Sequence, residues 1–213
     1  MQNLVELCGM KIGIVVYDGA DELDFIGPHE VLRAAAKAGK AVETSLLSIE
    51  PQAEVVAGFG LKLRPEGVLD DAKLDLLIVP GGGWVAREAT GAWAEYQRGV
   101  LPKKIARLHA AGVMVAGVCT GTMLLAAAGV LKDKPAITHH RAVDELRALG
   151  VQVVQARVVD AGDVITCGGV TSSLDLAFWL VERFWGEALA DGIARSFEYT
   201  RSRDVQVLPA KRS

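Results

Sequence analysis

The run Val113–Leu125 constrains the fold more than any other part of the chain. Val113–Ala116 is a short apolar segment typical of a buried strand, and helix-forming residues follow from Thr122 to Ala128. Between them stands Gly117-Val118-Cys119-Thr120-Gly121, a G-x-C-x-G motif. This is the thiol version of the nucleophile elbow, in which a reactive side chain occupies a tight strand-to-helix turn. The two glycines keep Cβ atoms away from that turn.

Two effects at this turn favour the thiolate of Cys119, which is the nucleophilic form of cysteine. A helix that begins just after Cys119 places partial positive charge and free N–H groups beside the sulfur. The alternative is a small core residue, because free Cys is among the most buried residue types. The position at the end of a strand favours the reactive interpretation, since open α/β sheets bind ligands at the carboxyl ends of their strands.

Strand-like and helix-like segments alternate along the rest of the chain. Continuous apolar runs predict strands and helical spacing predicts helices. The expected strands are residues 11–17, 42–49, 74–79 and 113–116; the expected helices are 27–37, 93–111, 122–128, 141–149 and 172–185; and residues 151–159 and 163–167 form a hairpin around Ala161-Gly162. The first helix should open at Gly27-Pro28, since Pro favours a first turn. This order predicts an α/β fold: a three-layer sandwich of a mostly parallel sheet with helices on both faces.

The composition is that of an ordinary globular protein, with 51% hydrophobic and 23% charged residues. The 213 residues suit a single domain, with a core of about residues 10–199 and a polar, loosely held tail from 200 to 213. The net charge of −3 gives no reason to expect nucleic acid or an anionic membrane as partner. No stretch approaches the ~20 apolar residues of a membrane helix. Met1–Met10 lacks the pattern of a signal peptide, so we expect a cytoplasmic protein.

The three cysteines are Cys8, Cys119 and Cys167. They are too few and too scattered for a disulfide framework, which fits a reducing compartment. Cys8 precedes the first strand and Cys167 closes a late one, so we interpret both as structural. No metal-ligand spacing such as C-x-x-C or H-E-x-x-H occurs, so no metal is expected.

Three further segments supply candidate groups at the same edge of the sheet. Asp24, between Leu23 and Phe25 in the loop after the first strand, could shuttle a proton beside the thiol; the alternative is a cap on the following helix. Pro80-Gly81-Gly82-Gly83 ends the third strand with N–H groups that suit an oxyanion; the alternative is a plain turn. Thr138-His139-His140 offers a base for the thiol, or a helix start with an exposed ring.

Five ordered blocks lie between Lys11 and Tyr199: Leu23–Pro28, Val79–Gly82, Val118–Gly121, Ala136–His139 and Gly168–Asp175. Together they resemble the ThiJ/PfpI superfamily, and most of all its isocyanide hydratase branch, which includes the sensor domains of some AraC-type regulators. The resemblance implies a flavodoxin-like fold similar to class I glutamine amidotransferases. It also implies a homodimer that acts on a small molecule without a cofactor.

The resemblance also assigns roles to single residues. Cys119 matches the family nucleophile, and Asp24 matches its acidic hydrogen-bond partner, which is Glu in other branches. Thr120 stands where the peptidase-like branch has His, which argues against a Cys-His peptidase. The amides of Gly82 and Thr120 match the anion-binding hole. The remaining matches are supporting residues: Gly81, His139, Thr171 and Asp175.

The C-terminus departs from the hydratase pattern. Glu198-Tyr199 is present, but Thr200-Arg201-Ser202-Arg203 replaces a Pro-rich stretch. The pocket shape and the dimer contacts implied by the resemblance therefore do not carry over to this stretch.

Three kinds of function remain open. The first is hydration of an isocyanide to an N-substituted formamide by Cys119 and Asp24. The second is a sensor or stress-response module with an oxidisable cysteine. No helix-turn-helix follows Tyr199, which favours a free-standing enzyme or stress protein. The third is hydrolysis or glyoxalase chemistry, as in sister branches.

Overall fold

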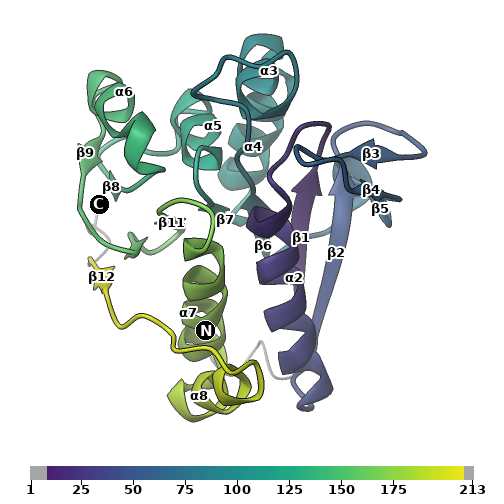
Figure 1. The fold of residues 1–213 in the computed structure, drawn as a ribbon, viewed down its shortest axis with the longest axis vertical. Helices are drawn as coiled ribbons and strands as arrows, with labels where there is room; N and C mark the ends of the chain where they lie inside the picture. Colours follow the sequence, from purple (N-terminus) through teal and green to yellow (C-terminus); the bar gives the residue numbers. More distant parts are fainter. Residues whose placement is uncertain (1–8, 209–213) are drawn as a thin grey trace.

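The computed structural model describes residues 9–208, which build one eight-stranded sheet (Figure 1). Neighbouring strands are parallel except β10 and β11, which pair antiparallel. Across the sheet the order is β12 (Val205–Val207), β10 (Val158–Asp160), β11 (Val164–Cys167), β7 (Met114–Gly117), β6 (Leu76–Val79), β1 (Met10–Val16), β2 (Val42–Ser48) and β5 (Gly67–Val68). Two separate pairs are β3 (Val55–Val56) with β4 (Lys62–Leu63) and β8 (Pro135–Ala136) with β9 (Gln152–Val153).

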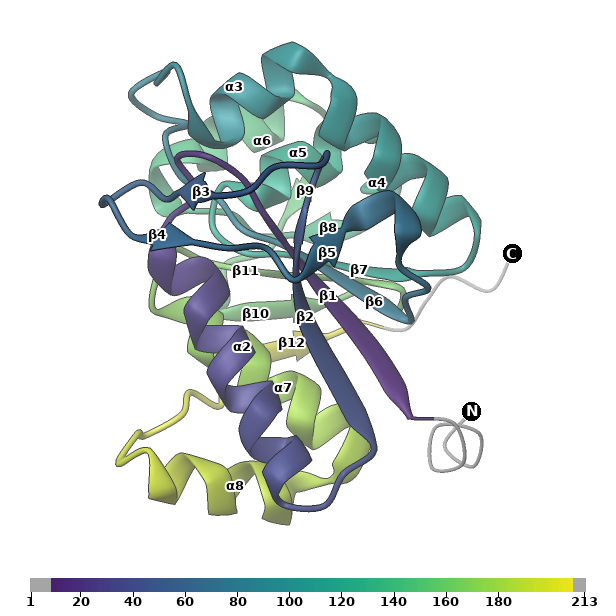
Figure 2. The ribbon, with the colours of Figure 1, turned by 90° about the vertical axis from the view of Figure 1, so that its right-hand side faces the viewer.

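Helices cover both faces of the sheet (Figure 2). One face carries α2 (Glu22–Lys37), α7 (Ser172–Trp185) and α8 (Glu187–Ser196); the other carries α3 (Gly91–Arg98), α4 (Val100–Ala110), α5 (Gly121–Ala127) and α6 (Val143–Ala148). Single turns of 3₁₀ helix span Leu69–Asp71 and His140–Ala142. The predicted three-layer α/β sandwich is confirmed. Within the described residues, no helix has the length and hydropathy for a bilayer crossing.

The central strands bring four connections to one edge of the sheet. β6 and β11 are buried along their whole length, as expected for strands covered on both faces. β1 leads into the start of α2, β6 into Gly81, β7 into Cys119 and β11 into Gly168. Because these strands are parallel, the four chain segments meet at their carboxyl ends.

The first helix begins earlier than predicted. It starts at Glu22, not at Gly27-Pro28, and Pro28 lies inside it. Asp21 caps this helix, because its side chain accepts a hydrogen bond from the Leu23 N–H at 3.2 Å. The prediction used Pro28 as a start signal, but the cap six residues upstream decides the boundary.

Two other helix predictions differ from the structure for local reasons. The expected helix over residues 93–111 is split into α3 and α4 at Gly99, whose φ of 69° is left-handed. The prediction of 172–185 is confirmed by α7, but α8 was not anticipated after Gly186. The predicted hairpin turn is present between β10 and β11, where the Ala161 N–H donates to the Val164 carbonyl at 2.9 Å.

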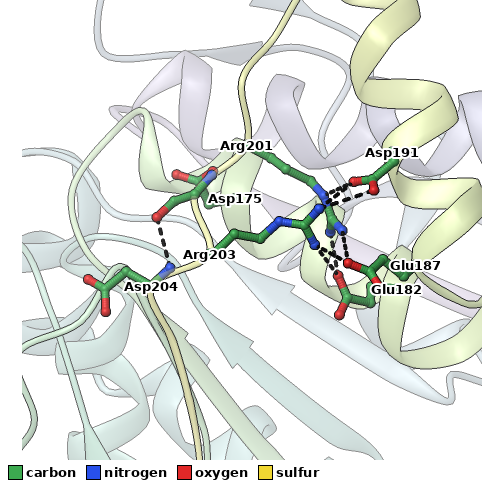
Figure 3. Close-up of polar contacts among 8 residues, drawn as sticks. Asp175, Glu182, Glu187, Asp191, Arg201, Arg203 and Asp204 are labelled. Atoms are coloured by element: carbon green, nitrogen blue, oxygen red, sulfur yellow. Dashed lines mark hydrogen bonds and ion pairs between the residues drawn. The ribbon is translucent and has the colours of Figure 1, made fainter.

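The C-terminal segment is held tightly up to residue 208, contrary to the expectation of a loose tail. Figure 3 shows Arg201 and Arg203 turned toward the carboxylates of α7 and α8. Arg201 pairs with Asp191 at 2.6 Å and with Glu182 at 2.5 Å, and its side chain is only 5% exposed. β12 then pairs in parallel with β10. These contacts are long-range in sequence, so polarity alone did not predict them.

Candidate functional site

The turn at Cys119 has the strained geometry of a nucleophile elbow. Cys119 has a φ of 54°, in the left-handed region that non-glycine residues rarely adopt. Its N–H donates to the Gly168 carbonyl at 3.0 Å, and its carbonyl accepts from the Thr138 hydroxyl at 2.8 Å. Such a backbone costs about 1–3 kcal/mol and persists where neighbours hold it in place. Here β11 and the Thr138 segment supply that support.

The glycines of the motif are required by close packing. A Cβ on Gly121 would lie 2.1 Å from the Val79 carbonyl oxygen, and one on Gly117 would lie 2.9 Å from Leu125. Gly81 also approaches the elbow, because its Cβ would lie 2.6 Å from the Thr120 nitrogen. The sequence-based role of the glycines, which is to keep Cβ atoms out of the turn, agrees with this geometry.

Asp24 points into the protein beside the elbow. Its side chain is fully buried in the first turn of α2, and Oδ2 accepts the Gly81 N–H at 2.9 Å. Oδ1 has no hydrogen-bond partner. The interpretation of Asp24 as a helix cap is therefore wrong, since Asp21 is the cap. A fully buried carboxyl with a free oxygen is suited to hold a proton.

Burial raises the pKa of both titratable groups of the site, Asp24 and Cys119. Burial raises the pKa of Asp24 well above its usual range, and Asp21 adds to this, whereas the Gly81 N–H and the Cys119 thiol oppose it. Burial also raises the pKa of the Cys119 thiol, and the Asp24 charge raises it further. N–H groups of Val170 and Thr120 point at the sulfur and oppose this rise.

This corrects the expectation that the turn alone favours a thiolate. The helix and N–H groups are present, but burial and the adjacent carboxylate outweigh them, because a single charge is costly in a site only 5% exposed. A thiolate at Cys119 is best stabilised when Asp24 carries a proton. The pair then holds one negative charge, and its titration belongs to both groups together.

The expected anion hole is partly occupied by the protein itself. The Gly82 N–H donates to the Thr120 hydroxyl at 3.1 Å, so that amide is free only after the Thr120 side chain rotates. The Thr120 N–H points at the Cys119 sulfur, and its assignment to an anion hole stays a prediction. The Val170 N–H also points at the Cys119 sulfur, and no local sequence pattern indicated this. Its φ of 41°, after Gly168-Gly169, turns that amide toward the elbow.

His139 lies near the elbow without a hydrogen bond to Cys119. Its Nδ1 accepts the Arg141 N–H at 3.2 Å, and its ring packs where a Cβ on Gly169 would lie 2.3 Å from Cδ2. Burial lowers the pKa of His139, and the nearby His140 and Arg141 lower it further, which keeps the ring neutral. The structure therefore places His139 in the wall of the site.

A pocket of about 530 Å³ lies on the far side of Thr138 and Val170 from the elbow, and neither Cys119 nor Asp24 lines it. Its lining includes Thr138 and Val170, which both contact Cys119, and the side chains of His139 and Arg157. Asp204, at the start of the C-terminal strand segment, closes another side. The pocket therefore has several polar side chains in its wall and is connected to Cys119 through Thr138 and Val170. Within residues 9–208 we find no cluster of three or more His, Cys, Asp or Glu side chains that could hold a metal ion.

Comparison with known proteins decides the family. Residues 10–183 match the DJ-1/PfpI family. The chain belongs to this family. It is 33% identical to isonitrile hydratase of Pseudomonas putida over 192 residues, which is 89% of this chain and 78% of that enzyme. It is also 32% identical to the HTH-type transcriptional regulator CdhR of Pseudomonas aeruginosa, and it spans only 44% of that regulator's length.

Solved structures of DJ-1/PfpI proteins share the fold. A THiJ/PfpI family protein from Pseudomonas syringae has a TM-score of 0.78 at 25% identity, covering 93% of this chain and 78% of that one. Oxidised Toxoplasma gondii DJ-1 has a TM-score of 0.76 at 20% identity, covering 90% of this chain and all of that one. The expected superfamily and its flavodoxin-like α/β fold are confirmed.

In this DJ-1/PfpI chain, Asp175 and Thr171 both bind the Arg157 side chain. Asp175 is buried on α7, where Oδ2 accepts from Arg157 Nε at 2.8 Å and Nη2 at 2.5 Å. Its Oδ1 accepts the Ser202 N–H at 2.7 Å, so it also fixes the C-terminal segment. Thr171 accepts from Arg157 Nη2 at 3.4 Å. Asp175 thus links Arg157, which lines the pocket, to Ser202 in the stretch that replaces the expected Pro-rich one.

Proposed function

We propose that this DJ-1/PfpI protein is a cysteine-dependent hydratase of small electrophiles, with isocyanides as the substrate class. One observation carries the proposal: a strained elbow cysteine faces a fully buried, raised-pKa Asp24. The similarity to isonitrile hydratase supports the choice of substrate. The pocket beside Thr138 and Val170 offers room for the substituent on the isocyanide nitrogen.

The reaction follows from one sulfur and one carboxyl group. The Cys119 thiolate attacks the terminal carbon of the isocyanide, and protonated Asp24 delivers its proton to that carbon, which gives a thioimidate. Water then adds to the thioimidate carbon, with one water proton going to the nitrogen. Collapse expels the Cys119 thiolate and returns the other water proton to Asp24. The product is an N-substituted formamide, and both residues return to their starting state.

Peptidase chemistry fits these groups less well. Peptide hydrolysis expels an amine, which calls for a general acid such as His beside the nucleophile. The neighbour of Cys119 is Thr120, whose neutral hydroxyl is a poor proton donor and already accepts the Gly82 N–H. His139 makes no hydrogen bond to the thiol. Isocyanide hydration expels no amine and needs only the proton that Asp24 can carry.

The test is turnover by purified protein, followed as formamide formation from a small alkyl isocyanide. Cys119→Ala should abolish it, and Asp24→Ala should lower it about 10²-fold or more, the usual effect of a positioned acid–base group. Gly192→Ala on α8, where a Cβ would meet nothing closer than 3.8 Å, serves as the control variant. Unchanged isocyanide consumption by Cys119→Ala, or casein cleavage by the wild type, would overturn the proposal.

A sensor or stress-response function is the alternative, supported by the similarity to the transcriptional regulators CdhR and GbdR of Pseudomonas aeruginosa. The chain spans 44% and 52% of these two regulators. Absence of turnover with isocyanides, methylglyoxal and peptide amides would favour this alternative. Both functions place Cys119 at the centre of the site.

A further inference from the structure

Tyr17, the residue after β1, has a buried hydroxyl at the sheet edge that carries the site. Its side chain is only 2% exposed, and the hydroxyl donates a hydrogen bond to the Pro80 carbonyl at 2.5 Å. Pro80 follows β6, which pairs in parallel with β1. A buried tyrosine hydroxyl needs a hydrogen-bond partner, and this bond supplies one. The peptide group that it contacts gives the bond a second role.

The Pro80–Gly81 peptide connects Tyr17 to Asp24. Its carbonyl accepts from the Tyr17 hydroxyl, and the Gly81 N–H on the opposite side of the same trans peptide donates to Asp24 Oδ2 at 2.9 Å. A hydrogen bond to a carbonyl polarises its peptide group and strengthens the N–H of that group as a donor. The Tyr17 hydroxyl therefore strengthens the bond that holds the carboxyl group, which in turn interacts with the Cys119 thiol.

Gly81 requires such a hold, because a glycine leaves the adjoining peptide planes more torsional freedom than any other residue. Its carbonyl accepts the Asp21 N–H at 2.9 Å, and a Cβ on it would lie 2.6 Å from the Thr120 nitrogen. Gly81 therefore packs between the start of α2 and the elbow. A rotation of the Pro80–Gly81 peptide would turn its N–H away from Asp24. The Tyr17 hydroxyl opposes this rotation, because it holds the carbonyl end of the peptide.

We propose that Tyr17 is a positioning residue of the site, which acts through the Pro80–Gly81 peptide to hold the Asp24 carboxyl group beside Cys119. Two hydrogen bonds and one rigid peptide unit connect the tyrosine hydroxyl to the carboxyl oxygen. The part of Tyr17 in turnover rests on the proposed hydration. Its effect on the Cys119 thiol does not, because that effect requires only the folded protein.

The hydrogen bonds give the direction of this effect. The Gly81 N–H lowers the pKa of Asp24 against the effect of burial, because it stabilises the carboxylate. Loss of the Tyr17 hydroxyl weakens this donor, so Asp24 should keep its proton to higher pH. The charge of Asp24 raises the pKa of Cys119, so a thiolate should form more readily beside the neutral acid. Burial raises the pKa of Tyr17 well above its usual range, so its hydroxyl stays a donor.

Other titratable groups also face Tyr17, Asp24 and Cys119. They are Asp21 at the N-cap of α2, Glu95 on α3 and Cys167 at the end of β11. All three are present in wild type and in Tyr17→Phe, which differ by a single oxygen atom. A difference in thiol reactivity between these two proteins therefore reports the tyrosine hydroxyl.

The experiment is a double-mutant cycle on the full chain, with the rate of Cys119 alkylation by iodoacetamide measured across a pH series. Peptide mapping separates Cys119 from Cys167, which is fully buried, and from Cys8, which lies outside the described residues. Above the pH at which Asp24 ionises, Tyr17→Phe should react about twofold faster than wild type, which corresponds to about 0.3 pH unit. In an Asp24→Asn background the same substitution should change nothing, because no carboxylate remains for the peptide to stabilise.

Tyr96→Phe is the matched control, since it removes the same oxygen atom from a ring on α3 that packs against Trp84. It should react at the wild-type rate. In turnover of an isocyanide, Tyr17→Phe should lower kcat severalfold at unchanged KM, because Asp24 does not line the pocket. Absence of turnover by wild type, with the alkylation result intact, would reject the hydratase and keep the role of Tyr17. Equal alkylation of Tyr17→Phe and wild type, with only a lower Tm, would overturn the proposal, as would an equal effect in the Asp24→Asn background.

Discussion

The substitution Gly121→Ala tests whether the elbow depends on close contact with β6. Gly121 is the first residue of α5, and its φ is not in the left-handed region, so alanine suits the backbone itself. The added Cβ would nevertheless lie 2.1 Å from the Val79 carbonyl oxygen, 2.6 Å from the Pro80 oxygen and 2.8 Å from the Pro80 carbon. All three are backbone atoms, which no rotamer change can move away.

The cost follows from what must shift. Overpacking against movable side chains costs about 1–3 kcal/mol, and here a strand end must separate from the start of α5. We therefore expect Gly121→Ala to lower the free energy of unfolding by about 3 kcal/mol or more. In a chain of this length that corresponds to a loss of about 6–12 °C in Tm. The Cys119 thiol should also alkylate differently, because the same shift moves the elbow.

The matched control is Gly192→Ala in the interior of α8. There a Cβ meets only Arg195 Nη2 at 3.8 Å, and alanine is a better helix former than glycine. We expect it to raise the free energy of unfolding by about 0.4–1 kcal/mol. Both variants are compared with wild type by urea unfolding and by iodoacetamide labelling of Cys119. Equal stability of Gly121→Ala and wild type, with equal labelling rates, would refute the argument from close contact.

Three further predictions concern single contacts. Asp24→Asn removes a carboxyl group whose pKa is raised by burial in the folded protein. At pH values above the ordinary Asp pKa of about 4, the folded wild type still binds this proton whereas the unfolded chain has lost it, so the stability of the wild type should fall relative to Asp24→Asn as pH rises, by up to about 1.4 kcal/mol per pH unit. A stability difference in urea unfolding that does not change with pH would contradict this. Arg201→Ala removes the ion pairs of a side chain that is only 5% exposed and should lower the free energy of unfolding by about 3 kcal/mol. Arg203→Ala, whose side chain is 55% exposed, should lower it by less than about 1 kcal/mol. Equal losses of Tm in the two variants would count against the importance of the buried ion pairs. Thr120→Val removes the acceptor of the Gly82 N–H and should cost about 1–2 kcal/mol by thermal unfolding, whereas an unchanged Tm would mean that this bond contributes nothing.

Local signals in the sequence were sufficient for several parts of the fold. The G-x-C-x-G run predicted a tight turn, and Cys119 has a positive φ there. Helical spacing over residues 172–185 and the Ala161-Gly162 turn correspond to α7 and the β10–β11 hairpin. The inference that Asp24 points inward also agrees with the structure, because its apolar neighbours Leu23 and Phe25 marked a buried stretch. Each of these features depends on residues close together in the chain.

Other features depend on contacts that no local pattern reports. The raised pKa of Cys119 follows from burial and from Asp24, 95 positions upstream in the same sequence. The Val170 N–H reaches the sulfur only because β11 ends beside β7. The order of the C-terminal segment follows from Asp175 and from the acidic side chains of α7 and α8, which pair with Arg201. Polarity suggested a loose tail there because a charged residue looks the same in sequence whether it is solvated or paired.

The position of Asp24 explains how one carboxyl group would serve the proposed hydration. Its Oδ2 is fixed by the Gly81 N–H, so the carboxyl cannot turn away, while Oδ1 stays available for a proton. Burial favours the neutral acid, and a neutral acid is what a thiolate at Cys119 requires beside it. In the proposed hydration this proton goes to the isocyanide carbon. The strained turn and the N–H groups of Thr120 and Val170 hold the Cys119 sulfur beside this acid, so the proposal depends on all of these groups together.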